Sequence, residues 1–117
     1  MRTLLQLPSP SRRKTSRVDA PENVRVYWSC AGHKDVLHVR NLSFGGIFVS
    51  THETQSVGAK AQIDFLVEEG QIRTNAIVCH VESTNGMGLK FTAIAPEDRP
   101  RLAALVSRLR SVFRSGI

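Results

Sequence analysis

Residues 36–49 read VLHVRNLSFGGIFV, and this stretch decides the fold. Its first seven residues are typical of a β-strand, with Leu37 and Val39 on one face. Residues 43–46 then supply a small, glycine-rich turn, and the last three residues begin another strand. The stretch therefore predicts two neighbouring strands joined by a turn whose backbone can approach a ligand closely.

Alternating apolar residues continue on both sides of this stretch. Further strands are expected at residues 24–28, 61–67, 72–81 and 87–91. Turn signals separate the strands, and the strongest of them is Asn85-Gly86. Six short strands with turns at these intervals predict an all-β fold, a small six-stranded antiparallel β-barrel over residues 24–93.

The spacing of apolar residues changes after the last strand. Residues 97–114 carry apolar side chains at helical intervals, namely Leu102, Leu105, Val106, Leu109, Val112 and Phe113. We expect Asp98 as the N-cap, Pro100 in the first turn and Gly116 as the stop signal of this single C-terminal helix. Its apolar stripe is expected to pack on the barrel, and the alternative is a stripe kept for a partner or a dimer.

The N-terminal end has no apolar periodicity. Residues 1–11 are rich in proline and serine and are expected to form a disordered leader. Residues 12–17, RRKTSR, form a flexible basic arm, which continues to residue 23 before the first strand. The first 40 residues hold eight of the sixteen Arg and Lys residues against three acids, so the arm is expected to meet an anionic partner.

The composition sets the broad class. A chain of 117 residues with 41% hydrophobic residues can fill one small core. No apolar run approaches the roughly 18 residues of a membrane span, and the Leu4–Leu7 stretch is too short for a signal peptide, so a cytoplasmic location is expected. Cys30 and Cys79 are expected to be reduced, largely buried thiols. A zinc site built from Cys30, His33 and His38 is a weak alternative, since it lacks a fourth ligand.

Two motifs stand in order along the chain. Arg13 and Arg17 fit the pattern RxxxR, while Asn41, Ser43 and Gly46 fit the pattern (D/N)xSxxG. Together they resemble the two motifs of the PilZ domain, a family whose members typically bind the bacterial second messenger cyclic di-GMP.

The resemblance covers residues 12–114. It implies a cyclic di-GMP receptor that changes conformation on binding and signals to a partner protein, with no cofactor and no metal. It also implies that Arg12 contributes to the site and favours a stacked pair of ligands. Motility and biofilm formation are the processes implied at the level of the family.

The residue types suit this ligand. An arginine fork binds phosphate oxygens bidentately, pairs with guanine O6 and N7, and stacks on a purine. The amide of Asn41 can both donate to and accept from a guanine edge. Ser43 offers a hydroxyl that is expected to reach base or phosphate, and Gly46 leaves space for the ligand.

Two other functions remain open. A small basic barrel can bind nucleic acid, but the chain holds only seven aromatic residues for base stacking. A PilZ-like adaptor without ligand is the second alternative, although the arginines are present. No catalytic residues are assigned, because no nucleophile with a base and no carboxylate pair stands out, and an enzyme is not expected.

Overall fold

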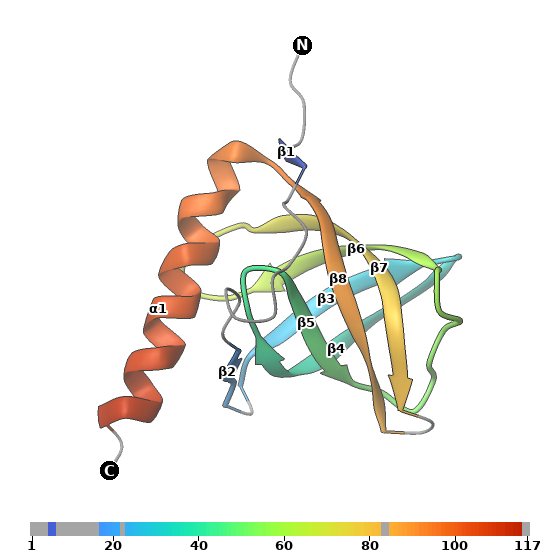
Figure 1. Ribbon diagram of the computed structural model, residues 1–117, viewed down its shortest axis with the longest axis horizontal. Coiled ribbons are helices and arrows are strands. Elements are labelled where there is room, and N and C mark those ends of the chain that lie inside the picture. The colour runs from blue at the N-terminus through green and yellow to red at the C-terminus, as the bar shows by residue number, and fades with distance from the viewer. Residues whose placement is uncertain (1–4, 7–16, 22, 83–84, 116–117) are drawn as a thin grey trace.

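The computed structural model describes residues 5–6, 17–21, 23–82 and 85–115. Figure 1 shows a barrel of strands with one helix along its side. The elements are β1 (Leu5–Gln6), β2 (Val18–Asp19), β3 (Arg25–Cys30), β4 (His33–Leu42), β5 (Gly46–Ser50), β6 (Lys60–Leu66), β7 (Arg73–Glu82), β8 (Gly86–Ile94), the 3-10 turn η1 (Pro96–Asp98) and α1 (Arg99–Ser115).

Six strands close the barrel. They pair in the order β8-β5-β4-β3-β6-β7, and β7 pairs with β8 to complete the circle. Every pairing is antiparallel. Closure removes the unpaired strand edges, so the backbone N–H and C=O groups of a small sheet find hydrogen-bond partners. The expected six-stranded antiparallel barrel with one C-terminal helix is confirmed.

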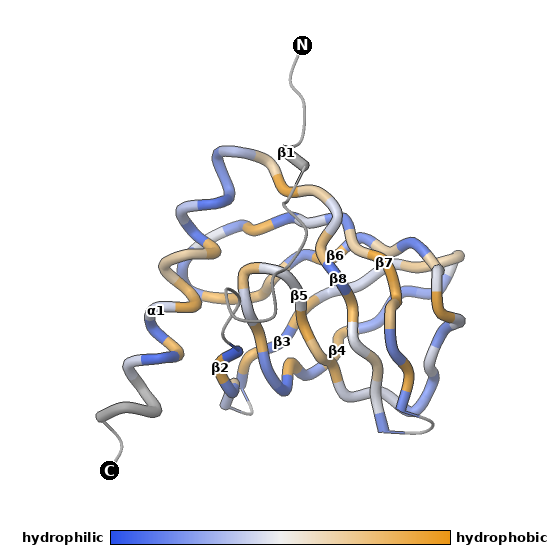
Figure 2. The backbone as a smooth tube through the Cα atoms, in the orientation of Figure 1, coloured by the Kyte–Doolittle hydropathy of each residue, from blue (hydrophilic) through white to orange (hydrophobic). Residues whose placement is uncertain are grey.

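Alternate side chains of each strand fill the interior, as the alternation of colours along the strands in Figure 2 shows. Phe65 of β6 meets Phe91 of β8 edge to face, with ring centroids 6.2 Å apart. The largest fully buried side chains include Leu42, Ile47, Ile63, Ile72, Met87 and Leu89. Each contributes about 1.5–3 kcal/mol through the hydrophobic effect, so the barrel interior carries most of the stability.

Helix α1 packs on the barrel. The part of its apolar stripe that the structure describes is fully buried in the common core, namely Leu102, Leu105, Val106 and Leu109. This confirms the expected packing for these four side chains, while the side chains of Val112 and Phe113, like Gly116, lie outside the described part. The helix therefore belongs to the domain core.

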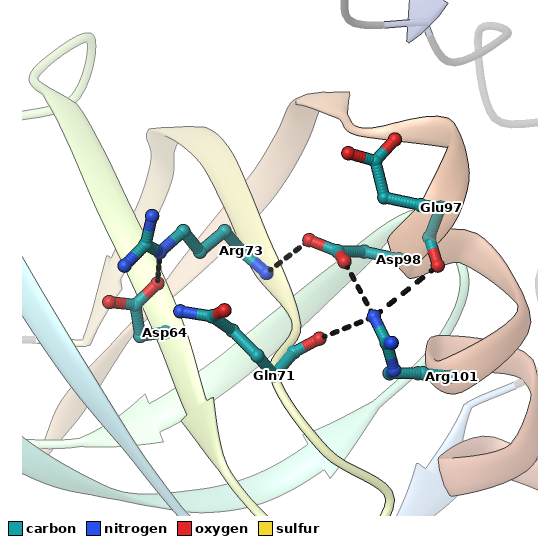
Figure 3. Close-up of polar contacts among 6 residues, drawn as sticks. All are labelled: Asp64, Gln71, Arg73, Glu97, Asp98 and Arg101. Atoms are coloured by element: carbon teal, nitrogen blue, oxygen red, sulfur yellow. Dashed lines mark hydrogen bonds and ion pairs between the residues drawn. The ribbon is translucent and has the colours of Figure 1, made fainter.

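Asp98 holds the start of the helix in a way that the sequence did not predict. The expected N-cap stands immediately before α1, but its carboxylate accepts from the backbone N–H of Arg73 at 3.1 Å and from Arg101 Nη1 at 2.9 Å (Figure 3). The 3-10 turn of residues 96–98 turns the carboxylate toward β7. Asp98 therefore links β7 to the helix and does not cap it.

A second link joins the helix to the β6–β7 hairpin. Arg108 donates to both carboxylate oxygens of Glu69, and its Nη2 lies 3.1 Å from Oε1. These hydrogen bonds lower the pKa of the Glu69 carboxyl, against burial, which raises it. Glu68 lies 3.4 Å from the same guanidinium, but its side chain is 74% exposed.

We expect Glu69→Gln to lower the free energy of unfolding by about 1–3 kcal/mol at pH 7, because a charge-assisted pair is lost. The folded-state pKa of Glu69 is depressed, so its contribution is complete above the ordinary value of 4.5 and is lost as the pH falls through the lower folded value. Urea unfolding at several pH values measures the difference. The control Glu68→Gln should change stability by less than about 1 kcal/mol; equal losses for both variants would contradict the assignment.

Three other expectations need correction. Leu5 and Gln6 pair with Ile94 and Ala93 of β8, so these two residues of the expected disordered leader form a strand, while the rest of residues 1–11 lies outside the described part. Strand β4 begins at His33 and not at residue 36, because only Ala31 and Gly32, with φ of 51° and 85°, make the turn.

The third correction concerns the cysteines. Cys30 is buried, and its burial raises the pKa of the thiol. Cys79 is a free thiol too, but it is exposed. Ala76 and Val78 of β7 are buried, so the alternation of the strand places Cys79 on its outer face.

Candidate functional site

A bulge in β4 brings two consecutive side chains to the outer face of the barrel. The pairing of β4 with β5 shifts register between Val39 and Asn41, so Arg40 is the extra residue. Val39 and Leu42, on either side, are fully buried, whereas Arg40 is exposed and Asn41 is half-buried. The bulge therefore presents a cation and an amide side by side just before the turn.

Strand β2 lies against this bulge. Val18 pairs with Leu42 and Asp19 pairs with Asn41, and the backbone N–H of Ala20 donates to the carbonyl of Arg40 at 3.0 Å. β2 also contacts α1, so it lies between the barrel and the helix (Figure 1). Since Asp19 stands opposite Asn41, an uncharged amide at that position avoids two facing carboxylates.

The two sequence motifs meet here. Arg17, which immediately precedes β2, donates from Nη1 to Oδ1 of Asn41 at 2.7 Å. The two residues are 24 positions apart in the sequence, and each comes from a different motif. Arg12 and Arg13, the other arginines predicted for this site, lie outside the described residues.

Ser43 organises the turn that follows. Its backbone N–H donates to the carbonyl of Gly46 at 2.9 Å, and its Oγ accepts from the backbone N–H groups of Gly45 at 3.1 Å and Gly46 at 3.2 Å. The residue is only 2% exposed. The hydroxyl thus fixes the shape of the loop that carries Asn41. Its expected contact with the ligand stays a prediction.

Replacing Ser43 with alanine leaves two turn N–H groups without their acceptor. We expect a loss of about 1–3 kcal/mol of stability, together with weaker ligand binding, because the turn beside Asn41 relaxes. Chemical unfolding measures the first effect. Ser50→Ala in β5 is a suitable control, since the Ser50 hydroxyl forms no hydrogen bond with the described part of the chain; a comparable loss there would argue against the role of Ser43.

Gly46 is held by the neighbouring strand. A Cβ built on Gly46 would collide with the carbonyl oxygen of Leu89 in β8. The N–H of Phe91 donates to the carbonyl of Gly45 at 2.9 Å, which keeps the turn pressed against β8. Gly46 does not have a positive φ, in contrast to Gly32. The glycine is therefore required by the close approach of two strands.

Sequence reasoning missed Arg40 and Phe48. The guanidinium carbon of Arg40 lies 5.0 Å from the centroid of the Phe48 ring, which is a cation–π contact. Phe48 is also the cross-strand partner of Asn41. The bulge that places Arg40 there depends on the pairing with β5, and no pattern within residues 36–49 indicates it.

Other sites are poorly supported. The described ranges contain no group of three or more His, Cys, Asp or Glu side chains that could hold a metal ion. In particular, Cys30 of the zinc alternative is buried, while His38 contacts the carbonyl of Pro21 at 3.2 Å. Among the described residues, α1 is the longest helix, and no helix is long and apolar enough to cross a membrane.

Comparison with known proteins gives a consistent result. The family model of the PilZ domain matches residues 11–108. No curated protein sequence is significantly similar to the chain. Among solved structures, the PilZ domain of YcgR from Escherichia coli, solved with cyclic di-GMP, is similar with a TM-score of 0.74 and 17% identity, over 91% of this chain and 97% of that one.

Two longer proteins share the fold. MotI, the inhibitor of motility from Bacillus subtilis, is similar with a TM-score of 0.70 and 26% identity, over 87% of this chain and 52% of that one. The complex of K. pneumonia MrkH with cyclic di-GMP gives 0.71 and 18%, over 92% and 56%. The chain thus spans about half the length of these two proteins.

Proposed function

Because its family match extends over residues 11–108, this chain belongs to the PilZ domain family, and we propose that it is a cyclic di-GMP receptor. In this proposal the ligand lies at the junction of β2, the β4 bulge and the turn of residues 43–46. Arg12, Arg13, Arg17 and Asn41 contact the ligand, while Ser43 and Gly46 shape the turn.

The hydrogen bond between Arg17 and Asn41 is the observation that carries the proposal. It brings the end of the basic arm to the only amide side chain of the turn motif. An arginine has five N–H donors in a rigid fork, and this bond uses one of them. The other N–H donors of Arg17 suit a ligand that combines phosphate oxygens with guanine edges.

The relatives support the same ligand. The YcgR domain and MrkH were both solved with cyclic di-GMP, and this chain has their fold. The fold by itself does not specify a ligand. The motif residues Arg13, Arg17, Asn41, Ser43 and Gly46 extend the argument to this chain, since they match both patterns without a substitution.

We further propose that binding changes the position of the arm and is read by a partner protein. β2 contacts both β4 and α1, so a change at the arm reaches the helix directly. The protein acts in the cytoplasm as a receptor and not as an enzyme.

Isothermal titration of the purified protein tests the proposal. Cyclic di-GMP should bind far more tightly than GTP or cyclic di-AMP, because the site reads guanine edges and phosphates together. The nucleic-acid alternative predicts comparable binding of random single-stranded DNA, with an affinity that falls steeply as salt is raised. Absence of cyclic di-GMP binding would leave the adaptor function and reject the receptor.

A further inference from the structure

Two glycines of β8, Gly86 and Gly88, leave part of its outer face without side chains, and an aromatic ring from β5 lies over them. Phe48 of β5 is the cross-strand partner of Gly88. A Cβ built on Gly86 would lie 2.8 Å from Phe48 Cε1, and one on Gly88 would lie 3.6 Å from Cδ2. The ring therefore fills part of the space above the two glycines, together with the carbonyl oxygen of Val49 beside Gly86 and the Cβ of His80 beside Gly88. The Phe48 side chain is half-buried, and it packs against the backbone of β8.

Arg40 covers this ring from the solvent side. Its guanidinium carbon is 5.0 Å from the ring centroid, and Arg40 is exposed. Arg40 also lines a polar hollow of about 520 Å³ with Ser50, Thr51, His52 and Asn85. The guanidinium therefore lies over the Phe48 ring, and the hollow opens beside it.

The position of Arg40 relative to the site is set by backbone pairing. It is the neighbour of Asn41 on the bulge, and its carbonyl accepts from Ala20 at the end of β2. Asn41 in turn stands opposite Phe48 and accepts from Arg17. Arg17, Asn41 and the Arg40–Phe48 pair are therefore neighbours on the outside of the barrel.

We propose that Arg40 is a further ligand-binding residue, which stacks its guanidinium plane on a guanine base while Phe48 supports the other face. This inference rests on the proposed function and adds to it the residues that recognise the base plane. In this arrangement the aromatic ring, the guanidinium and the purine form a stack next to the amide of Asn41.

The chemistry favours arginine at this position. A guanidinium is flat and weakly hydrated, so it stacks on aromatic faces, whereas a lysine ammonium is a compact, strongly hydrated charge. Contact with Phe48 also restricts the side chain before the ligand arrives, which reduces the ordering entropy lost on binding. A base that stacks here is read by its face, and its edge remains available to Asn41 and Arg17.

The test is titration of cyclic di-GMP into wild type and the variants Arg40→Ala, Arg40→Lys and Phe48→Leu. Arg40→Ala should weaken binding by at least about tenfold, the change expected from the loss of one stacked base. Arg40→Lys should weaken it nearly as much, because the charge remains and the plane is lost. Phe48→Leu keeps an apolar cover over β8 and should give an intermediate loss.

Matched measurements separate the possible outcomes. Arg99→Ala removes an exposed arginine at the start of α1 and should bind like wild type, and melting curves without ligand should show that all variants fold. Wild-type affinity in Arg40→Ala would overturn the stack and leave the receptor intact. Wild-type affinity in Arg40→Lys would also overturn it, since charge alone would then suffice. Failure of wild type to bind cyclic di-GMP would reject both the receptor and the stack.

Discussion

Gly46→Val is expected to disrupt the domain and to abolish ligand binding as a consequence. The added Cβ meets the carbonyl oxygen of Leu89 in β8, and backbone on the neighbouring strand cannot move aside without breaking the β5–β8 pairing. A branched side chain in such a contact should cost about 3 kcal/mol or more. Because a domain of this size is stable by roughly 5–15 kcal/mol, the melting temperature should fall by more than about 10 °C.

Two variants frame this prediction. Gly46→Ala introduces the same first carbon without branching and should give a smaller loss. Phe44→Ala changes a side chain of the same turn that is 45% exposed, and it should leave the melting temperature unchanged. If Gly46→Val melted like wild type and only failed to bind, the glycine would be needed for space at the ligand, as the sequence first indicated.

Arg13→Ala and Arg17→Ala should each weaken cyclic di-GMP binding by about tenfold to a hundredfold, with almost no change in stability. Loss of one charge-assisted hydrogen bond to the ligand is worth roughly 1.5–3 kcal/mol, which gives this range. In the ligand-free protein the Arg17 side chain is exposed and donates to Asn41, a contact that contributes little to folding. Calorimetry and thermal melting measure the two effects separately.

Lys14→Ala is the matched control, since it removes one positive charge from the same arm and leaves the two arginines of the RxxxR motif in place. It should reduce affinity only slightly, through the general attraction of the arm for an anion. An equal loss in all three variants would mean that the arm acts by charge alone. A large drop in the melting temperature of Arg17→Ala would instead make that arginine part of the fold.

The barrel and the helix could be predicted from the sequence because their signals are local. Alternation placed Leu37 and Val39 in the core, and helical spacing placed Leu105 and Leu109 there as well. The junction of the two motifs followed from the family resemblance. The bond between Arg17 and Asn41 agrees with it, although this bond alone leaves the ligand to be measured.

Features that depend on a neighbouring strand could not be predicted. The bulge at Arg40 arises from a register shift, and only the pairing of whole strands defines a register. The constraint on Gly46 comes from Leu89, far along the chain. The contact of Asp98 with the backbone of Arg73 likewise joins residues 25 positions apart.

Strand β2 has a consequence for how a downstream protein can be found. It consists of two residues, pairs with the end of β4 and contacts α1, so its docking depends on both neighbours at once. Coupling between two binding events is reciprocal. Suppose that a partner protein binds α1 and favours the paired state of β2. It must then raise the affinity of the domain for the nucleotide by a certain factor, and the nucleotide must raise the affinity of the domain for the partner by the same factor. The nucleotide's affinity is therefore itself an assay for the partner, and a candidate protein that changes this affinity when added is coupled to the nucleotide site.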